Sequence, residues 1–313
     1  MKKVSVFLFL FFLELMLLQA GCCRAPGKEK FVSMNRSRNN LTPEEELVIV
    51  RKGTERPFSG KYNDFFNAGV YICRRCGALL YRSEDKFKTT CGWPGFDDEF
   101  PGAVRRVPDA DGKRTEITCA RCGAHLGHVF TGEHLTPKNV RHCVNSVSLE
   151  FVPAAKFAER KTAYFAGGCF WGVEYLFEQK NGVYYAESGY MGGRLEKPTY
   201  KDVCSGKTGH YETVKIVYNP GKITYEELVK YFFENHDPEQ ADGQGPDKGE
   251  QYKSVIFTSD DKELEICRKR MKVLEDNGIH PLTQILPVFR FWKAEDYHQN
   301  YYSKNGRRGL RGD

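Results

Sequence analysis

The stretch Cys-Arg-Arg-Cys-Gly at residues 73–77 recurs as Cys-Ala-Arg-Cys-Gly at residues 119–123. The glycine after each pair lets backbone amides turn toward thiolate sulfur, and four thiolates in two such pairs form a closed structural zinc site. The expected ligands are Cys73, Cys76, Cys119 and Cys122. Because such a site has no open coordination position, this zinc would stabilise the fold and perform no chemistry. Two disulfides, or thioredoxin-like redox pairs, are the alternative interpretation.

The region around these two Cys-x-x-Cys knuckles, residues 41–152, is predicted to be mostly β structure. Short segments alternate with turn-forming residues such as Pro-Asp-Ala-Asp-Gly at 108–112, and residues 144–152 alternate as a strand does. One short helix is expected at the start, because Thr42 can cap it and Pro43 suits its first position.

The pattern changes after a linker at residues 153–161. Residues 162–166 are typical of a buried strand that runs through two glycines into a helix, and Thr224 begins a capping-box spacing. Further strands are expected at residues 210–218 and 251–258, with helices at 224–235 and 260–276. Strands that alternate with helices argue for an α/β or α+β domain over residues 162–313. Of these we expect an α+β domain, an α/β sandwich around a central mixed sheet. No internal repeat relates the two domains.

Residues 1–22 are typical of a secretory signal. Two lysines precede an apolar run at residues 4–18, and small residues follow it. The run is shorter than the ~20 residues that span a membrane. Ala-Gly-Cys, which ends at Cys22, resembles a bacterial lipobox, although Gln19 and Glu14 depart from that pattern. We expect export to the cell envelope or periplasm, a polar tether at residues 23–40, and membrane attachment if Cys22 carries a lipid.

The composition is that of a globular protein and argues against several functions. Hydrophobic residues make up 40% of the 313 residues and charged residues 28%, with a formal net charge of +6. Basic residues are dispersed among acidic ones, so nucleic-acid binding is not expected. No glycine-rich nucleotide fingerprint is present in the sequence, so neither a nucleotide nor a flavin cofactor is expected.

Two of the remaining cysteines have surroundings that favour a reactive thiolate. Cys143 is flanked by Arg141 and His142, whose positive charges would stabilise the thiolate. Cys169 follows two glycines at the predicted strand-to-helix junction, where the helix dipole and unpaired amides act in the same direction. From these residues alone, a buried core thiol is the alternative at both positions.

Three motifs of the first region resemble the B-type methionine sulfoxide reductases. They are Cys-Gly-Trp-Pro at 91–94, Arg-Cys-Gly-Ala-His-Leu-Gly-His-Val-Phe at 121–130 and Arg-His-Cys-Val-Asn-Ser-Val-Ser-Leu-Glu-Phe at 141–151. The resemblance implies that Cys143 is the nucleophile, Cys91 the resolving cysteine and Trp93 the wall of a methyl pocket. The groups that would polarise the sulfoxide or orient the thiolate are His125, His128, Arg141 and Asn145. Thr-Gly-Glu at 131–133 replaces the usual acidic pair and glycine, which leaves open which acid supports His128.

The second region resembles the A-type methionine sulfoxide reductases. The motifs that carry the resemblance lie at residues 168–172, 189–193, 198–200, 203–206, 208–212 and 235–238. The resemblance implies that Cys169 is the nucleophile and that Glu212, kept protonated by an apolar pocket, protonates the sulfoxide oxygen. The substrate pocket would comprise Phe170, Trp171, Tyr200, Asp247 and Tyr252, with the two tyrosines bonded to the oxygen and Asp247 orienting them.

Together these features predict an enzyme that reduces methionine sulfoxide, free or in oxidised proteins. The resemblance assigns the R epimer to the first domain and the S epimer to the second, with thioredoxin or another dithiol as reductant. No cysteine is present in the tail at residues 305–313, so we expect Cys169 to be recycled by an external thiol rather than by Cys204 or Cys267. The rival hypothesis is a zinc-knuckle binding module fused to a non-catalytic thiol domain.

Overall fold

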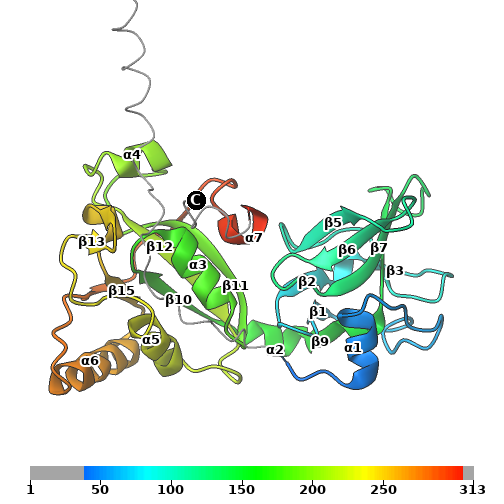
Figure 1. The fold of residues 1–313 in the computed structure, drawn as a ribbon, viewed down its shortest axis with the longest axis horizontal. Helices are drawn as coiled ribbons and strands as arrows, with labels where there is room; N and C mark the ends of the chain where they lie inside the picture. The colour runs from blue at the N-terminus through cyan, green and yellow to red at the C-terminus, as the bar shows by residue number, and fades with distance from the viewer. Residues whose placement is uncertain (1–38, 306–313) are drawn as a thin grey trace, which may run out of the picture.

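A computed structural model of the chain describes residues 39–305, which form two domains (Figure 1). The expected signal segment with Cys22, and most of the expected tether, lie outside the described residues. Between residues 39 and 305, no helix is long and apolar enough to cross a membrane.

The first domain begins with a short helix, α1 (Pro43–Ile49), that starts where the capping residues predict. The Thr42 side chain accepts a hydrogen bond from the Glu45 amide, and the Glu45 carboxylate accepts one from the Thr42 amide at 2.9 Å. This reciprocal capping box satisfies two amides that the helix leaves unbonded.

Two antiparallel sheets make up the rest of this domain. The three-stranded sheet has the order β2 (Leu79–Arg82), β1 (Gly69–Cys73) and β9 (Leu149–Pro153). The six-stranded sheet has the order β3 (Lys86–Phe87), β4 (Gly95–Phe96), β8 (Val140–Val144), β7 (His125–Thr131), β6 (Thr115–Cys119) and β5 (Val104–Pro108). Aromatic residues such as Tyr71, Tyr81 and Phe96 fill the core between them. The prediction of a mostly-β first domain is confirmed.

The prediction of a single strand at residues 144–152 is wrong in one respect, because the strand is interrupted. β8 ends at Val144, and β9 begins only at Leu149. The Glu55 carboxylate accepts hydrogen bonds from the amides of Ser146, at 2.7 Å, and Val147, at 3.1 Å. These amides are therefore not available to a neighbouring strand, and residues Ser146–Ser148 form a 3-10 turn. The alternating pattern does not reveal this distant carboxylate.

The second domain is built on a six-stranded mixed sheet, which confirms the α+β prediction. Its order is β16 (Gln284–Pro287), β15 (Val255–Thr258), β10 (Lys161–Ala166), β12 (Tyr211–Tyr218), β11 (Val183–Met191) and β17 (Trp292–Lys293). Only the β15–β16 pair among these is parallel. A second, two-stranded hairpin pairs β13 (Gly243–Gln244) with β14 (Asp247–Lys248).

Three helices share one apolar core with this sheet. They are α3 (Phe170–Glu178), α5 (Tyr225–Phe233) and α6 (Asp261–Asp276). The capping box predicted at Thr224 is present, and Asp260 caps α6. Two short helices complete the domain, α4 (Tyr200–Cys204) and α7 (Tyr301–Asn305). Cys204 therefore ends a helical turn.

The strand predicted at residues 251–258 is shorter than expected. Residues Glu250–Tyr252 form a 3-10 turn, and β15 begins only at Val255. The turn follows Gly249, whose φ of 137° is open mainly to glycine. A cluster of β-branched and aromatic residues therefore predicted the strand correctly but not its beginning.

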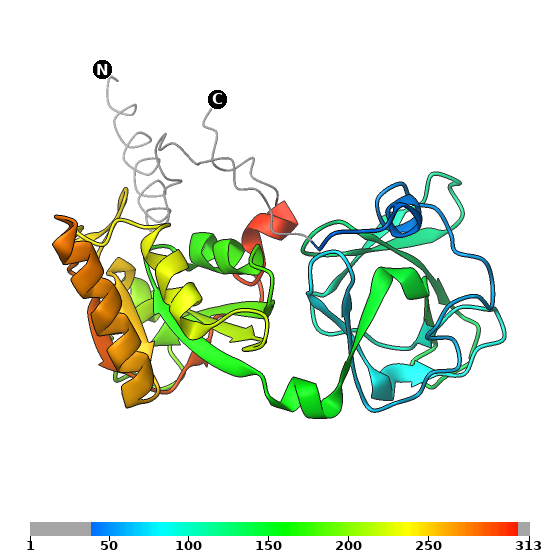
Figure 2. The same ribbon diagram turned by 90° about the horizontal axis from the view of Figure 1, so that it is seen from below.

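The two domains are in contact and do not only share a covalent connection. A short helix, α2 (Ala154–Ala158), connects β9 to β10, as Figure 2 shows. Val70, Ile72 and Leu79 of the first domain belong to one buried apolar cluster with Tyr184 and Val217 of the second. The ion pair between Lys222 and Glu150 also crosses the boundary, at 3.1 Å.

Candidate active sites and zinc site

The four knuckle cysteines converge, as their spacing predicts. Their sulfur atoms all lie within 4.8 Å of one another, and all four residues are buried. The Cys73 and Cys122 sulfurs are 3.7 Å apart, as are those of Cys76 and Cys119. A tetrahedron with Zn–S bonds of about 2.3 Å has an edge of about 3.8 Å, whereas a disulfide bond is about 2.05 Å long. The cluster therefore fits a zinc ion and is not paired as disulfides.

The first candidate active site is a pair of cysteines. Cys143 on β8 and Cys91, in the loop between β3 and β4, have their sulfur atoms 3.8 Å apart. The Arg141 guanidinium donates to the Cys91 sulfur at 3.5 Å, and its other donors form a two-point ion pair with Glu133 at 2.7 and 2.8 Å. The site therefore brings two thiols and one fixed positive charge together.

The two thiols share their protons unequally. Hydrogen bonding to Cys143 lowers the pKa of Cys91 to about 5, and the nearby Arg141 acts in the same direction. The same sulfur–sulfur contact raises the pKa of Cys143 above its ordinary value, and burial adds to this effect. At neutral pH the pair therefore holds one negative charge and one proton between two adjacent sulfur atoms.

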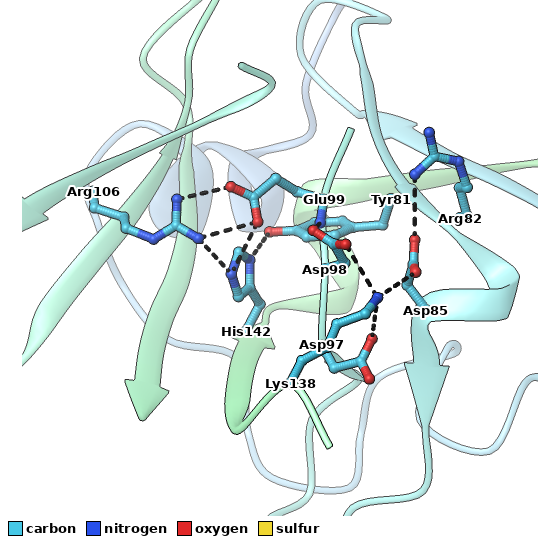
Figure 3. A network of polar contacts seen from close by, with 9 residues as sticks. All are labelled: Tyr81, Arg82, Asp85, Asp97, Asp98, Glu99, Arg106, Lys138 and His142. Atoms are coloured by element: carbon cyan, nitrogen blue, oxygen red, sulfur yellow. Dashed lines mark hydrogen bonds and ion pairs between the residues drawn. The ribbon is translucent and has the colours of Figure 1, made fainter. Parts of the chain in front are cut away.

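His142 does not lie beside the thiols, and its predicted part in stabilising the thiolate is wrong. Side chains alternate along a strand, so Arg141 and Cys143 share one face of β8 while His142 points to the other. There its Nδ1 contacts the Tyr81 hydroxyl at 3.2 Å, and Arg106 donates to its Nε2 at 3.1 Å (Figure 3). Burial lowers the pKa of His142 to about 4. The imidazole is therefore neutral at pH 7, and it supports β8 on the face opposite to the thiols.

A second part of the same network holds the beginning of β8. Lys138 lies 3.1–3.3 Å from carboxylate oxygens of Asp85, Asp97 and Asp98 (Figure 3). The three acids come from the turns on either side of β3 and β4. This ion-pair cluster ties the segment before β8 to the strands that flank the Cys91 loop.

Each of the two predicted histidines has its own acid. His125 Nδ1 lies 2.8 Å from Glu116, and His128 Nε2 lies 2.7 Å from Asp109. Asp109 therefore occupies the position that the sequence left open. Burial lowers the pKa of His125. The two rings lie 5.7 Å apart on β7, the strand that pairs with β8.

Asn145 and Trp93 are both hydrogen-bonded to the backbone of one residue, Glu55. The Asn145 side chain accepts from the Glu55 amide at 3.1 Å and donates to the Leu126 carbonyl at 3.1 Å. The Trp93 indole donates to the Glu55 carbonyl at 3.2 Å. Because both polar ends of Asn145 are bonded to backbone, its position orients the loops around the thiols.

The second candidate active site is centred on Cys169. This residue is the N-cap of α3 and directly follows β10 and a tight glycine turn. Gly168 has a φ of 94°, and a Cβ there would lie 2.6 Å from the Gln244 side chain. Only glycine fits this turn, which places Cys169 half-buried at the positive end of the helix dipole.

Glu212 lies beside the same helix end. It is fully buried on β12, and its carboxylate accepts a hydrogen bond from the Phe170 amide at 3.0 Å. The Phe170 amide is one of the unpaired donors of the first helical turn. The structure therefore brings the predicted nucleophile and the predicted acid to one helix terminus.

An aromatic wall surrounds this terminus. It comprises Phe170, Trp171, Tyr190, Tyr200, His298 and Tyr301. The Trp171 and Tyr301 rings stack at 3.6 Å, and the Trp171 indole donates to His298 at 3.0 Å. Burial lowers the pKa of His298 to about 4, so it accepts this bond as a neutral ring. The wall presents apolar faces suited to a methyl group.

Sequence reasoning missed His298, Tyr301 and the acid Glu295. Glu295 accepts from the Tyr200 amide at 2.9 Å and from the Tyr190 hydroxyl at 3.0 Å. The three missed residues lie in one segment, residues 295–301. This segment is over 80 residues from the motif at 208–212, the last but one of the motifs that carry the resemblance. The closely spaced aromatic and acidic residues at 295–302 were the available signal.

Asp247 and Tyr252 come from the small hairpin and the turn that follows it. Both side chains are buried, and the turn packs on β12, the strand that carries Glu212. Burial raises the pKa of Asp247 to about 6. Cys267 is instead buried on α6 against the Tyr225 hydroxyl.

Family models match both domains. One described as "SelR domain" matches residues 41–153, and one described as "Peptide methionine sulfoxide reductase" matches residues 161–311. The chain is similar to peptide methionine sulfoxide reductase B5 of Oryza sativa subsp. japonica, with 56% identity over 37% of this chain and 85% of the relative. It spans only 51% of the chloroplastic B3 protein of the same plant, also at 56% identity.

The second domain has relatives of its own. The peptide methionine sulfoxide reductase MsrA of Salmonella paratyphi B is 46% identical over 52% of this chain and 78% of the relative. Among solved structures, methionine sulfoxide reductase A of Corynebacterium diphtheriae is 38% identical, covering 47% of this chain and 76% of that chain with a TM-score of 0.44.

Proposed function

Since the chain belongs to the peptide methionine sulfoxide reductases, with a B-type domain before an A-type domain, we propose that it reduces methionine sulfoxide to methionine at two sites. The first domain takes the R epimer and the second the S epimer. Sulfoxide sulfur is chiral and each epimer needs its own enzyme, which is a physical reason to join two unlike domains.

The observation that carries this proposal is the Cys91–Cys143 pair, with its sulfur atoms 3.8 Å apart beside Arg141. Cys143 first passes its proton to the adjacent Cys91 sulfur and then attacks the sulfoxide sulfur as a thiolate. The sulfoxide oxygen takes up a proton and passes to Cys143 as methionine leaves. Cys143 is then a sulfenic acid. Cys91 attacks it, a disulfide forms and the oxygen leaves as water. A dithiol reduces the disulfide and is itself oxidised.

At the second site, Cys169 attacks in the same way and Glu212 supplies the proton to the sulfoxide oxygen. Complete burial disfavours a charged carboxylate, so Glu212 is suited to act as an acid. Phe170 and Trp171 hold the methyl group, while Tyr200, Tyr252 and Asp247 hold the oxygen. The resulting sulfenic acid is reduced by an external thiol.

A structural zinc ion completes the first domain. The four buried thiols Cys73, Cys76, Cys119 and Cys122 would hold it, and it supplies folding energy rather than chemistry. The reductant is thioredoxin or another dithiol protein, because disulfide exchange with such a protein closes the cycle.

We also propose that the chain is exported to the cell envelope or periplasm of a bacterium. The charged and apolar pattern of residues 1–22 supports this, and a lipid on Cys22 would attach the protein to the membrane. Mass spectrometry of the protein isolated from its natural host would test it. An intact chain that begins at Met1 in the cytoplasmic fraction would contradict export.

The activity is tested by NADPH oxidation with thioredoxin and thioredoxin reductase, on a methionine sulfoxide peptide of each epimer. We expect turnover with both. No turnover with either epimer, also when dithiothreitol replaces thioredoxin, would leave the binding-module hypothesis in place.

A further inference from the structure

One face of helix α3 contacts more than the apolar core of its own domain. Trp171, Glu174 and Glu178 are three and four residues apart and therefore lie on the same side of the helix. Trp171 stacks on Tyr301, and the Glu174 carboxylate accepts from the Asn300 amide at 2.9 Å. This face therefore binds the segment that leads into α7.

The first domain contacts the start of β11, the strand that follows α3. Arg121, in the second cysteine knuckle, donates to the carbonyls of Val183, at 2.8 Å, and Tyr184, at 2.5 Å, where β11 begins. Its side chain is buried at the domain boundary. A guanidinium with two short hydrogen bonds at a buried boundary is a strong and directional contact.

The first domain also contacts α7. Arg105 on β5 donates to the Ser303 carbonyl at 2.6 Å. Both views place α7, the red helix, between α3 and the first domain (Figures 1 and 2). The helix that carries Tyr301 is therefore in contact with the first domain on one side and with α3 on the other.

We propose that Arg105 and Arg121 are positioning residues for the second active site, acting from the first domain. Arg121 holds the start of β11, the strand that follows α3 and packs against it, and Arg105 holds α7, so that Tyr301 stays stacked on Trp171 beside Cys169. Neither arginine touches the site itself. The proposal rests on the proposed reduction of the S epimer, and it makes that activity dependent on the first domain's fold.

The test measures kcat and KM for both epimers with dithiothreitol in the full-length, zinc-loaded chain. Arg121→Ala should raise KM for the S epimer about tenfold, the usual effect of losing a hydrogen bond to a charged group. Arg105→Ala should raise it about threefold, because this side chain is exposed. In both variants kcat should change little, since Cys169 and Glu212 are intact, and the R-epimer parameters should not change. Arg121→Lys should recover part of the loss.

The control is Lys222→Ala, which removes another cross-domain contact, the ion pair with Glu150 on β9, in which neither α3 nor α7 takes part. It should leave both KM values unchanged. Hydrogen exchange provides a second readout: amides of residues 298–305 should exchange faster in the two arginine variants and at the wild-type rate in the control.

Unchanged exchange of residues 298–305 in both arginine variants would overturn the proposal, and so would an unchanged S-epimer KM in an active enzyme. Because Arg121 lies between zinc ligands, the zinc content of the Arg121→Ala and Arg121→Lys variants is measured and must equal that of the wild-type chain. A wild-type chain that reduces neither epimer contradicts the proposed function, whereas the exchange experiment still decides the positioning role.

Discussion

The two candidate sites place a reactive cysteine in very different surroundings. In the first domain Cys143 lies on a strand, with a second sulfur 3.8 Å away and a guanidinium beside the pair. In the second domain Cys169 caps a helix beside a buried carboxyl group and an aromatic wall. The first site thus stabilises charge with a side chain, and the second with a helix terminus.

This difference implies a division of labour between the sites. A nearby second thiol equips the first site to form its own disulfide with less than 2 Å of sulfur movement. The second site instead has an acid and an aromatic wall with apolar faces. The other cysteines of the second domain are on α4 and α6. The sites should therefore share their first chemical step and differ in their last.

The largest expected effect separates the sites completely. Cys143→Ser should abolish R-epimer reduction and leave S-epimer reduction intact, and Cys169→Ser should do the reverse, because serine is a far weaker nucleophile than a thiolate. Initial rates on each epimer with dithiothreitol measure this. Loss of both activities from one substitution would show that the two sites are not independent.

Zinc removal should affect the first domain more than the second. Structural zinc contributes ~10 kcal/mol or more to folding, so its loss should unfold the first domain. Metal analysis should find one zinc per chain, and circular dichroism after chelation should show loss of the β-rich signal. An active, folded chain without zinc would contradict the assignment. S-epimer reduction should survive with a raised KM, if the cross-domain arginines act as proposed.

Glu212 is the acid of the second site. The described groups that contact Cys91 and Cys143 in the first site include no such carboxyl group. Glu212→Gln should lower kcat for the S epimer by about 100-fold or more, since general acid catalysis contributes about that much. Glu187→Gln is the matched control, because Glu187 lies in the same sheet and pairs with Lys215. A small loss in Glu212→Gln, similar to that of the control, would exclude Glu212 as the acid.

In the first domain, the histidines and their acids can be tested by a smaller change. Asp109→Asn removes the carboxylate that His128 contacts at 2.7 Å, and should lower R-epimer kcat about tenfold. This is less than the ~100-fold or more contributed by a group that itself transfers the proton, because Asp109 acts through His128. Asp111→Asn is the control, because Asp111 lies in the same turn and pairs with Arg114, as Asp109 also does, whereas the carboxylate paired with His128 is that of Asp109. Equal rates for both variants would mean that Asp109 has no special part.

The sequence predicted those parts of each site that lie in short, local patterns. The knuckles, the capping boxes and the glycine turn before Cys169 depend on neighbouring residues only. It could not show which acid supports His128, because Asp109 is 19 positions away and approaches through a hairpin. It also misassigned His142, since adjacency in a strand places side chains on opposite faces. Tyr301 reaches Trp171 only through tertiary packing of the chain's end.

The smallest expected difference, and the most informative about the comparison, is in recycling. Cys267 is a poor candidate for resolving the Cys169 sulfenic acid. It is fully buried, and burial raises its pKa to about 11, so it is a protonated thiol at neutral pH. A thiolate is needed for the attack. Cys204 is half-buried at the end of α4, about 6 Å along the helix axis from Tyr200 at the aromatic wall. It is the stronger of the two candidates.

We nevertheless predict that the second domain forms no efficient internal disulfide and depends on an external thiol. Its turnover with thioredoxin should be slower than that of the first domain by up to about an order of magnitude, while dithiothreitol should support both sites, because a small thiol reaches a sulfenic acid directly. Cys204→Ser should then leave S-epimer turnover unchanged with either reductant. Peptide mapping after one turnover, in the Cys143→Ser background, gives the decisive measurement. A stoichiometric disulfide from Cys169 to Cys204 or Cys267 would show that the two sites finish the reaction alike, and that their surroundings differ only in how the thiolate is stabilised.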